Sequence, residues 1–166
     1  MSVWGEELAR PWIESTGGPL IVVPRACRAE WKGITNSDYD EACGVTGYLN
    51  VLNRHWGQVL VLGDEPMSTC VIQRPEGLAV VRWMYGPSEG ELLNVAMTAD
   101  LGGLVPVETL RVTLRAEPYV ILDSSDVGSR AESIEFTLYE GADVIRTYSV
   151  KDEAREVWLI LHSLGR

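Results

Sequence analysis

The histidines and cysteines come first, because imidazole and thiolate groups carry most catalytic and zinc-binding chemistry in proteins. His55 and His162 are far apart and belong to no HExxH or HxH spacing. Cys27, Cys43 and Cys70 are odd in number and contain no CxxC pair, which disfavours a disulfide framework and a thiolate zinc site. We therefore expect no metal, no cofactor, structural histidines, and cysteines buried as small apolar side chains.

Phosphate-binding patterns are also missing from the sequence. It has no GxGxxG and no GxxxxGK[ST] loop. Residues 123–126 carry two carboxylates but lack the closing Glu of a calcium loop, so we expect a solvated loop there. A Ser–His–Asp triad assembles only in the fold, and the scarcity of histidine makes a hydrolase the weakest alternative. The prediction is that the protein is not an enzyme.

The charge balance narrows the class of partner. The formal net charge is −10. Residues 1–83 contain ten acids and seven bases, whereas residues 84–166 contain fourteen acids and seven bases, so the excess lies in the second half. Such a field repels phosphate backbones and attracts basic proteins. We expect a basic protein partner and no nucleic acid; the alternative is that the acidity only keeps the chain soluble.

Targeting signals are not evident in the sequence. The first twelve residues include Glu6 and Glu7 and no apolar run, so no signal peptide is predicted. The apolar runs are much shorter than a membrane span, and the cysteines do not indicate an oxidising compartment. A cytoplasmic protein without a membrane partner is expected, and the sequence does not specify an oligomeric state.

The elements that must position any binding residue begin with a turn. Gly17-Gly18-Pro19 precedes the apolar run 20–23, which predicts a turn into a buried strand. Residues 25–37 are predicted as a loop, and a capping signal at Ser37 predicts one short helix near residues 37–43.

From Tyr48 onward the pattern favours strands. Alternating or apolar runs bounded by turn residues predict strands at 48–52, 59–62, 70–73, 78–85, 92–97, 110–114, 119–122, 133–139, 144–150 and 157–162. Residues 152–164 also fit a terminal helix, and periodicity leaves both alternatives open. The pattern predicts an α+β fold that is predominantly antiparallel β, in a single domain over residues 1–166.

An internal repeat is one interpretation of residues 59–161. A shift of 64 residues aligns 70–97 with 134–161 without a gap, and 59–62 aligns with 119–122 at a shift of 60. The alignment fits either a repeat spanning 59–97 and 119–161, with two similar β units packed together, or two meanders with similar turns. Both interpretations stay open.

The tryptophans divide by predicted element. Trp83 and Trp158 fall in predicted strands and are expected in the core. Trp31 and Trp56 fall in predicted loops, where an aromatic side chain either pins the loop to the body or anchors an interface. We favour pinning.

Several of these stretches together resemble the bacterial immunity protein 21 family. The resemblance covers residues 12–85 by motif and the rest by strand pattern. It is carried by Trp12, Gly17, Gly18 and Pro19 before LIVVP, Trp31 and Gly33, Tyr39 and Cys43 in DYDEAC, and Gly63 in LVLGDEP. It implies an α+β fold, no enzymatic activity, and tight binding to a toxin domain of a polymorphic toxin system. It supplies no binding residues, and these motif residues are expected to be structural.

The resulting hypothesis is an immunity protein that binds and neutralises a cognate, basic bacterial toxin through an acidic surface. Candidate contacts, chosen by charge and position, are Asp38, Asp40, Glu41, Asp123 and Asp126. The alternative is a small-ligand-binding β module, which an enclosed apolar cavity would favour.

Overall fold

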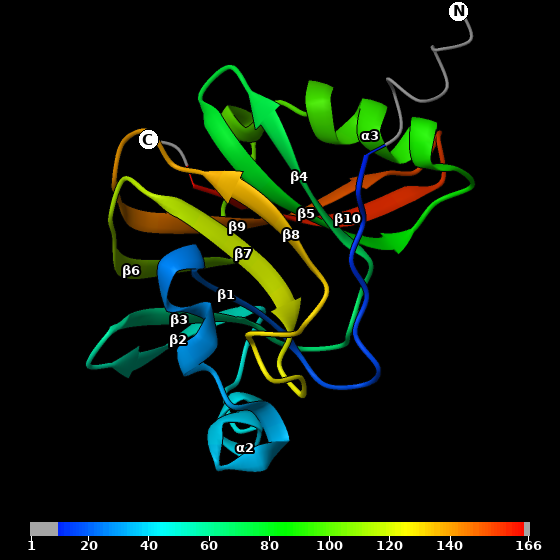
Figure 1. The fold of residues 1–166 in the computed structure, drawn as a ribbon. Helices are drawn as coiled ribbons and strands as arrows, with labels where there is room; N and C mark the ends of the chain where they lie inside the picture. The colour runs from blue at the N-terminus through cyan, green and yellow to red at the C-terminus, as the bar shows by residue number, and fades with distance from the viewer. Residues whose placement is uncertain (1–9, 165–166) are drawn as a thin grey trace, which may run out of the picture.

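The computed structural model describes residues 10–164 and shows a predominantly antiparallel β fold of the α+β class (Figure 1). Residues 1–9 and 165–166 lie outside the described part, and with them lie Trp4 and most of the segment for which no signal peptide is predicted. Within residues 10–164, ten strands form two five-stranded sheets, and every strand pair is antiparallel.

The two sheets draw their strands from interleaved parts of the chain. Sheet I has the order β2-β3-β1-β7-β8, with β1 Leu20–Pro24, β2 Leu49–Arg54, β3 Gly57–Leu62, β7 Pro118–Asp123 and β8 Ser133–Thr137. Sheet II has the order β4-β5-β10-β9-β6, with β4 Thr69–Arg74, β5 Gly77–Tyr85, β6 Glu108–Leu114, β9 Ala142–Asp152 and β10 Val157–Ser163.

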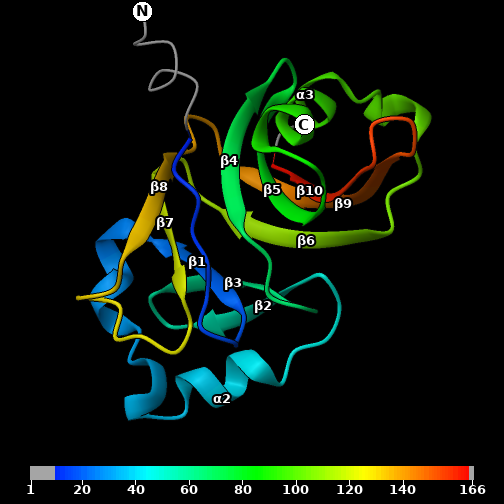
Figure 2. The same cartoon turned by 90° about the vertical axis from the view of Figure 1, so that its right-hand side faces the viewer.

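Short helices cover the outer faces of the two sheets. They are the 3₁₀ helices η1 Arg25–Glu30, η2 Gly33–Thr35 and η3 Leu101–Gly103, and the α-helices α2 Asp38–Cys43 and α3 Glu89–Thr98. Figure 2 shows α2 beside sheet I and α3 beside sheet II. The layers therefore run from the α2 side through sheet I and sheet II to α3, and α2 confirms the predicted helix near residues 37–43.

Strand β1 shows why the sandwich forms from this sequence. Alternate residues of a strand point to opposite faces. Leu20 and Val22 pack in the core between the sheets, whereas Ile21 and Val23 pack in a second core that includes Trp31 of the η1–η2 segment. Both faces of β1 are therefore buried, which explains its unbroken apolar run. Full burial of one such side chain stabilises the fold by about 1.5–3 kcal/mol.

Two buried polar side chains, Arg82 and His162, lie on the inner face of sheet II. The Arg82 guanidinium donates to the carbonyls of Tyr48, Gly63 and Glu65 at 3.0, 2.6 and 3.2 Å, and so joins β5 to the segments flanking β3 in sheet I. Burial lowers the pKa of Arg82 to about 10, although nearby acids oppose the shift.

His162 has a structural place, as expected. Its Nδ1 lies 2.7 Å from the hydroxyl of Thr147 on β9, and its side chain is completely buried. Burial, followed by the positive charge of Arg82, holds the pKa of His162 well below its ordinary value. His55 is exposed, in the turn between β2 and β3.

Two predicted elements were wrong. Residues 92–97 form the second half of α3 and not a strand, because the Ser88 hydroxyl accepts the Glu91 amide and caps the helix. Residues 25–37 contain η1, η2 and the residue that precedes α2, and so are not a plain loop. The open alternative at the end of the chain is settled as strand, because β10 spans Val157–Ser163.

The internal repeat is not confirmed. The shift of 64 residues places helix α3 on strand β10, so the aligned segments differ in secondary structure. It also places the β4–β5 hairpin on β8 and β9, which belong to different sheets. The structure therefore does not show two similar β units.

The tryptophans follow the predictions only in part. Trp31 is fully buried, and its indole donates to the Ser124 carbonyl at 2.9 Å, which confirms that it pins its segment. Trp83 and Trp158 are only half-buried, because each lies near the end of its strand.

Cys43 corrects the prediction that all three cysteines are buried. It is exposed at the end of α2, where the helix turns its last residue toward solvent, and Cys27 is half-buried. Cys70 alone is buried, and burial raises the pKa of its thiol to about 12.

Candidate partner-binding surface

Asp123, one of the five predicted contact residues, holds the loop after β7. This buried carboxylate accepts the amide and hydroxyl of Thr16 at 2.8 and 3.0 Å, and the amide and hydroxyl of Ser125 at 2.9 Å each. Burial alone would raise its pKa, but these four hydrogen bonds favour the ionised form and the pKa of Asp123 is lowered. Asp123 therefore fixes residues 16 and 125 beside each other.

Asp38 has a similar part at the start of α2. Its carboxylate is buried, accepts the Lys32 amide at 2.9 Å, and is paired with Arg54 of β2 at 3.1 Å. The carboxylates of Asp38 and Asp123 therefore both bind partners within the chain itself.

The two acidic segments of the sequence lie against each other in the fold. Ile34 of η2 donates its amide to the Ser125 carbonyl at 3.2 Å, and Gly128 donates to the Trp31 carbonyl at 2.9 Å. Gly33 has a φ of 59°, and a Cβ at this position would collide with the Asp126 carbonyl. Only glycine suits both the left-handed backbone and this close approach.

Three of the predicted acids are exposed on the joined segments. Asp40 and Glu41 lie on α2, and Asp126 lies in the loop after β7. Glu41 is paired with Arg54 at 3.3 Å and accepts the Ser37 hydroxyl at 2.9 Å. Burial, then the charges of Asp123 and Glu132, raise the pKa of Asp126. Exposed Ile34 supplies an apolar side chain on the same segment as these acids.

Asp126 also lines a cleft of about 510 Å³, here called the loop cleft. The cleft lies between the start of β4 and the start of β8, and residues 12–16 form its floor. It contains four carboxylates and no basic side chain among its lining residues, which include Glu14, Asp123, Asp126 and Glu132.

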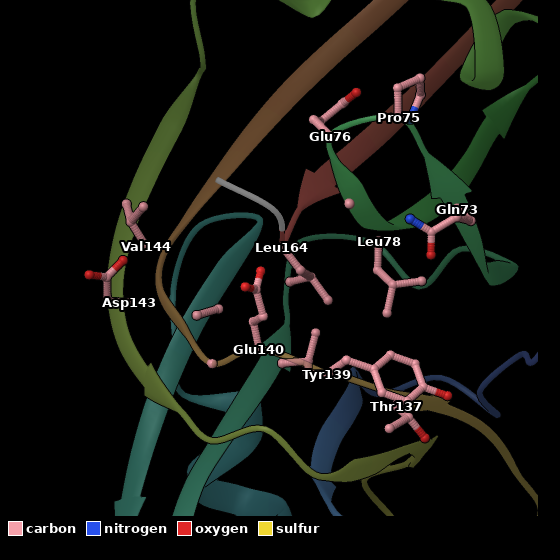
Figure 3. A pocket seen from close by; sticks show the side chains of 14 residues that line it. Gln73, Pro75, Glu76, Leu78, Thr137, Tyr139, Glu140, Asp143, Val144 and Leu164 are labelled. Carbon is pink, nitrogen blue, oxygen red and sulfur yellow. The ribbon is translucent and has the colours of Figure 1, made fainter.

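A second cleft, the edge cleft, lies at the other end of the same two strands. Its volume is about 580 Å³, and it is lined by the β4–β5 hairpin and the β8–β9 connection (Figure 3). Three of its lining residues are acids, Glu76, Glu140 and Asp143, and none is basic. Leu78, Leu138 and Leu164 supply an apolar floor, and the Tyr139 side chain is 88% exposed beside them.

Figure 2 shows what separates the clefts: the segment after Arg10 runs between β4 and β8. Ile13 exchanges two backbone hydrogen bonds with Thr69 of β4, at 2.9 and 3.0 Å. Both clefts therefore belong to one open side of the sandwich, where the lining side chains that carry charge are all acidic.

Other features point away from the alternatives. A third cleft, of about 340 Å³, is lined by both signs of charge, including Arg54, Arg115 and Glu117. All three clefts open to solvent, so none is the enclosed apolar cavity that a small-ligand module would favour. Within residues 10–164 there is no cluster of three or more His, Cys, Asp or Glu that would hold a metal ion, and no helix there is long and apolar enough to cross a membrane.

The family-motif residues near the first turn contact α2 and the loop after β7. Gly18 lies against the ring of Tyr39, where a Cβ would be 2.5 Å from the ring, and Gly17 has a φ of 149°. Pro19 accepts the amide of Ser124 through its carbonyl at 3.1 Å.

The remaining motif residues hold other parts of the fold. The indole of Trp12 donates to Glu89 of α3 at 2.7 Å. Gly63 leaves room for the Gly47 carbonyl, which a Cβ would strike.

Sequence reasoning missed the cleft acids Glu14, Glu76, Glu132 and Asp143. Each stands beside a turn or strand end with no pattern of its own, and only the pairing of distant strands brings them to one side.

Comparisons with known proteins give one match. The family model described as Immunity protein 21 matches residues 11–154. No curated protein and no solved structure matches the chain.

Proposed function

The chain belongs to the Immunity protein 21 family, and from this premise we propose that it binds and neutralises a cognate bacterial toxin domain without enzymatic activity of its own. The toxin is expected to be basic, at least around the site that the chain covers. We further propose that it acts in the cytoplasm and that neither nucleic acid nor membrane is its partner. The free state of all three cysteines is compatible with a reducing compartment.

The acidic open side of the sandwich is the observation that carries this proposal. The loop cleft holds four acids without a basic lining residue, and Asp40 and Glu41 extend the negative surface onto α2. Close charge pairs across an interface can couple by about 1.5–7 kcal/mol, and rim charges mainly accelerate association. Asp40, Glu41 and Asp126 are the proposed contacts, with Asp38 and Asp123 holding the segments that present them.

Co-expression with the toxin encoded beside its gene tests the proposal. We expect the chain to restore growth and to form a complex that survives size-exclusion chromatography. Unaffected toxicity together with the absence of a complex would overturn the proposed function.

A charge-matched pair of variants tests the location. Replacing Asp40, Glu41 and Asp126 by Asn, Gln and Asn should slow association about tenfold or more. The control replaces three exposed acids on the α3 side, Asp100, Glu153 and Glu156, by Asn, Gln and Gln, with the same change in net charge. Equal slowing by both variants would place the contact elsewhere.

A further inference from the structure

Strand β4 lies at the edge of sheet II, and its outward backbone groups face the open side. Thr69 exchanges hydrogen bonds with Ile13, so its amide and carbonyl point away from β5. Ser68, one residue earlier, accepts the Trp83 amide and so points toward β5. Because directions alternate along a strand, the amides of Val71 and Gln73 also point outward. The Val71 carbonyl accepts the Arg10 guanidinium at 3.3 Å, which agrees with this direction.

Strand β8 presents the opposite edge. The Leu138 amide donates to the Glu117 carbonyl. The backbone amides and carbonyls of residues 134, 136 and 138 therefore point toward β7, and those of Thr137 point away from it. Thr137 and Gln73 both line the edge cleft. The cleft thus lies between two strand edges that, within residues 10–164, pair with no further strand at this end. The segment at Ile13 pairs with β4 only at Thr69, toward the other end of the gap.

The side chains of the edge cleft suit a strand of alternating character. Successive residues of an incoming strand would face opposite sides. One side would meet Leu78, Leu138 and Leu164, which continue the core between the sheets. The other would meet solvent and the acids on the rim, where Asp143 is exposed and Glu76 is paired with Arg74 at 2.6 Å. Figure 3 shows Leu78 and Leu164 pointing into the same space as Tyr139.

We infer that the edge cleft binds an extended segment of the toxin, which adds as a strand to β4 at Val71 and Gln73. The segment alternates apolar residues, which enter between Leu78 and Leu164, with basic residues, which meet the acidic rim. Backbone hydrogen bonds supply affinity in this mode of recognition, and alternate side chains supply specificity. This inference rests on the proposed function and adds to it the surface and the form of the partner.

Amide hydrogen exchange, followed residue by residue in the free chain and in its complex with the toxin, provides the test. We expect the Val71 and Gln73 amides to exchange rapidly in the free chain and about tenfold or more slowly in the complex. A complex that leaves both amides unprotected would overturn the inference and leave the proposed function standing. Protection already present in the free chain would also overturn it, because the edge would then be covered. Absence of any complex would overturn the proposed function and this inference together.

A proline variant gives a second test. Gln73→Pro removes the outward amide and no hydrogen bond of the sheet, so the fold should persist while toxin affinity falls about tenfold or more. The matched control is Asn53→Pro, at an exposed position on the edge strand β2. The Tyr48 carbonyl accepts an amide from the β3 side, whereas the Leu49 amide donates to Glu108. Because directions alternate along the strand, the Asn53 amide points away from β3 as the Leu49 amide does. Equal affinity of the two variants, both folded by circular dichroism, would contradict strand addition at β4.

Discussion

Arg82 is the side chain on which the junction of the two sheets most depends. It donates to the carbonyls of Tyr48, Gly63 and Glu65, in the segments that flank sheet I, and it is 1% exposed. Arg82→Met keeps much of the volume but removes the hydrogen bonds from the guanidinium to these carbonyls, so we expect the free energy of unfolding to fall by about 2–4 kcal/mol. Urea denaturation measures this loss.

A matched arginine supplies the control for that prediction. Arg111 on β6 is exposed, and Arg111→Met should change stability by no more than about 0.5 kcal/mol. Similar losses for the two variants would show that the carbonyl contacts of Arg82 do not carry its effect.

His162 gives the protein a dependence on pH in a definite window. Burial lowers the pKa of His162 in the folded chain, whereas the unfolded chain binds a proton below about 6.5. The unfolded state then holds more protons, so the free energy of unfolding falls as the pH drops below about 6.5, by at most about 1.4 kcal/mol per pH unit. Urea denaturation at pH 7, 6 and 5 should show the slope, and His162→Gln should remove it.

The pH window separates this histidine from the carboxylates whose pKa is lowered in the fold. The pKa values of Glu76, Asp123 and Asp152 are lowered in the fold, so their stabilisation is present above the unfolded values and is lost only at about pH 4 and below. Exposed His55 is the control, because His55→Gln should keep the wild-type slope. A flat profile in the wild-type chain would contradict the prediction.

Single residues were predictable from the sequence only where one physical cause dominates. Trp31 is one such case: in a predicted loop a large aromatic ring favours pinning to the body, and the side chain is buried. Cys43 was expected to be buried from residue type alone. Cys43 is the last residue of α2, and its exposure depends on the orientation of the helix against sheet I. The sequence does not determine that orientation.

At the scale of elements, Gly33 couples η2 to the loop after β7. Gly33→Ala forces a Cβ into the Asp126 carbonyl at a φ of 59°, so we expect a loss of about 1–3 kcal/mol. Thermal unfolding followed by circular dichroism measures it. Gly44→Ala, at a φ of −83° with only ordinary contacts, should be within about 1 kcal/mol of wild type. A harmless Gly33→Ala would mean that the two acidic segments are not held together by this contact.

The strands were predicted well because their turns carry strong signals, and the single strand error has a clear cause. Residues 92–97 contain apolar residues close together, which fits a short buried strand as well as a helix. The deciding feature is Ser88, which caps the helix from outside this apolar run, so that α3 begins at Glu89. Neighbouring context settled the element, and periodicity did not.

At the scale of the whole molecule, the net charge of −10 should govern the speed of association. Raising the ionic strength from about 50 to 500 mM should slow binding to the toxin about tenfold or more, because screening shortens the range of the field. Stopped-flow mixing measures the rate. The variant without Asp40, Glu41 and Asp126 should depend less on salt, and equal salt dependence would contradict steering by this surface.

The α+β class and the antiparallel character were predictable, whereas the open acidic side was not. The class follows from short alternating runs joined by turns. The clefts depend on β4 and β8 lying on either side of residues 12–16, which are separated from them by about fifty or more residues of sequence. Long-range pairing of this kind leaves no local pattern.

The interleaved strand order also delays completion of the fold during synthesis. Strand β10 lies at the centre of sheet II between β5 and β9, and β1, in the middle of sheet I, pairs with β7. A nascent chain therefore has no finished acidic side until residue 163 has left the ribosome, and pairing between such distant strands is slow. Under the proposed function a half-translated copy gives no protection, so we expect a cell to hold completed copies before the toxin is made.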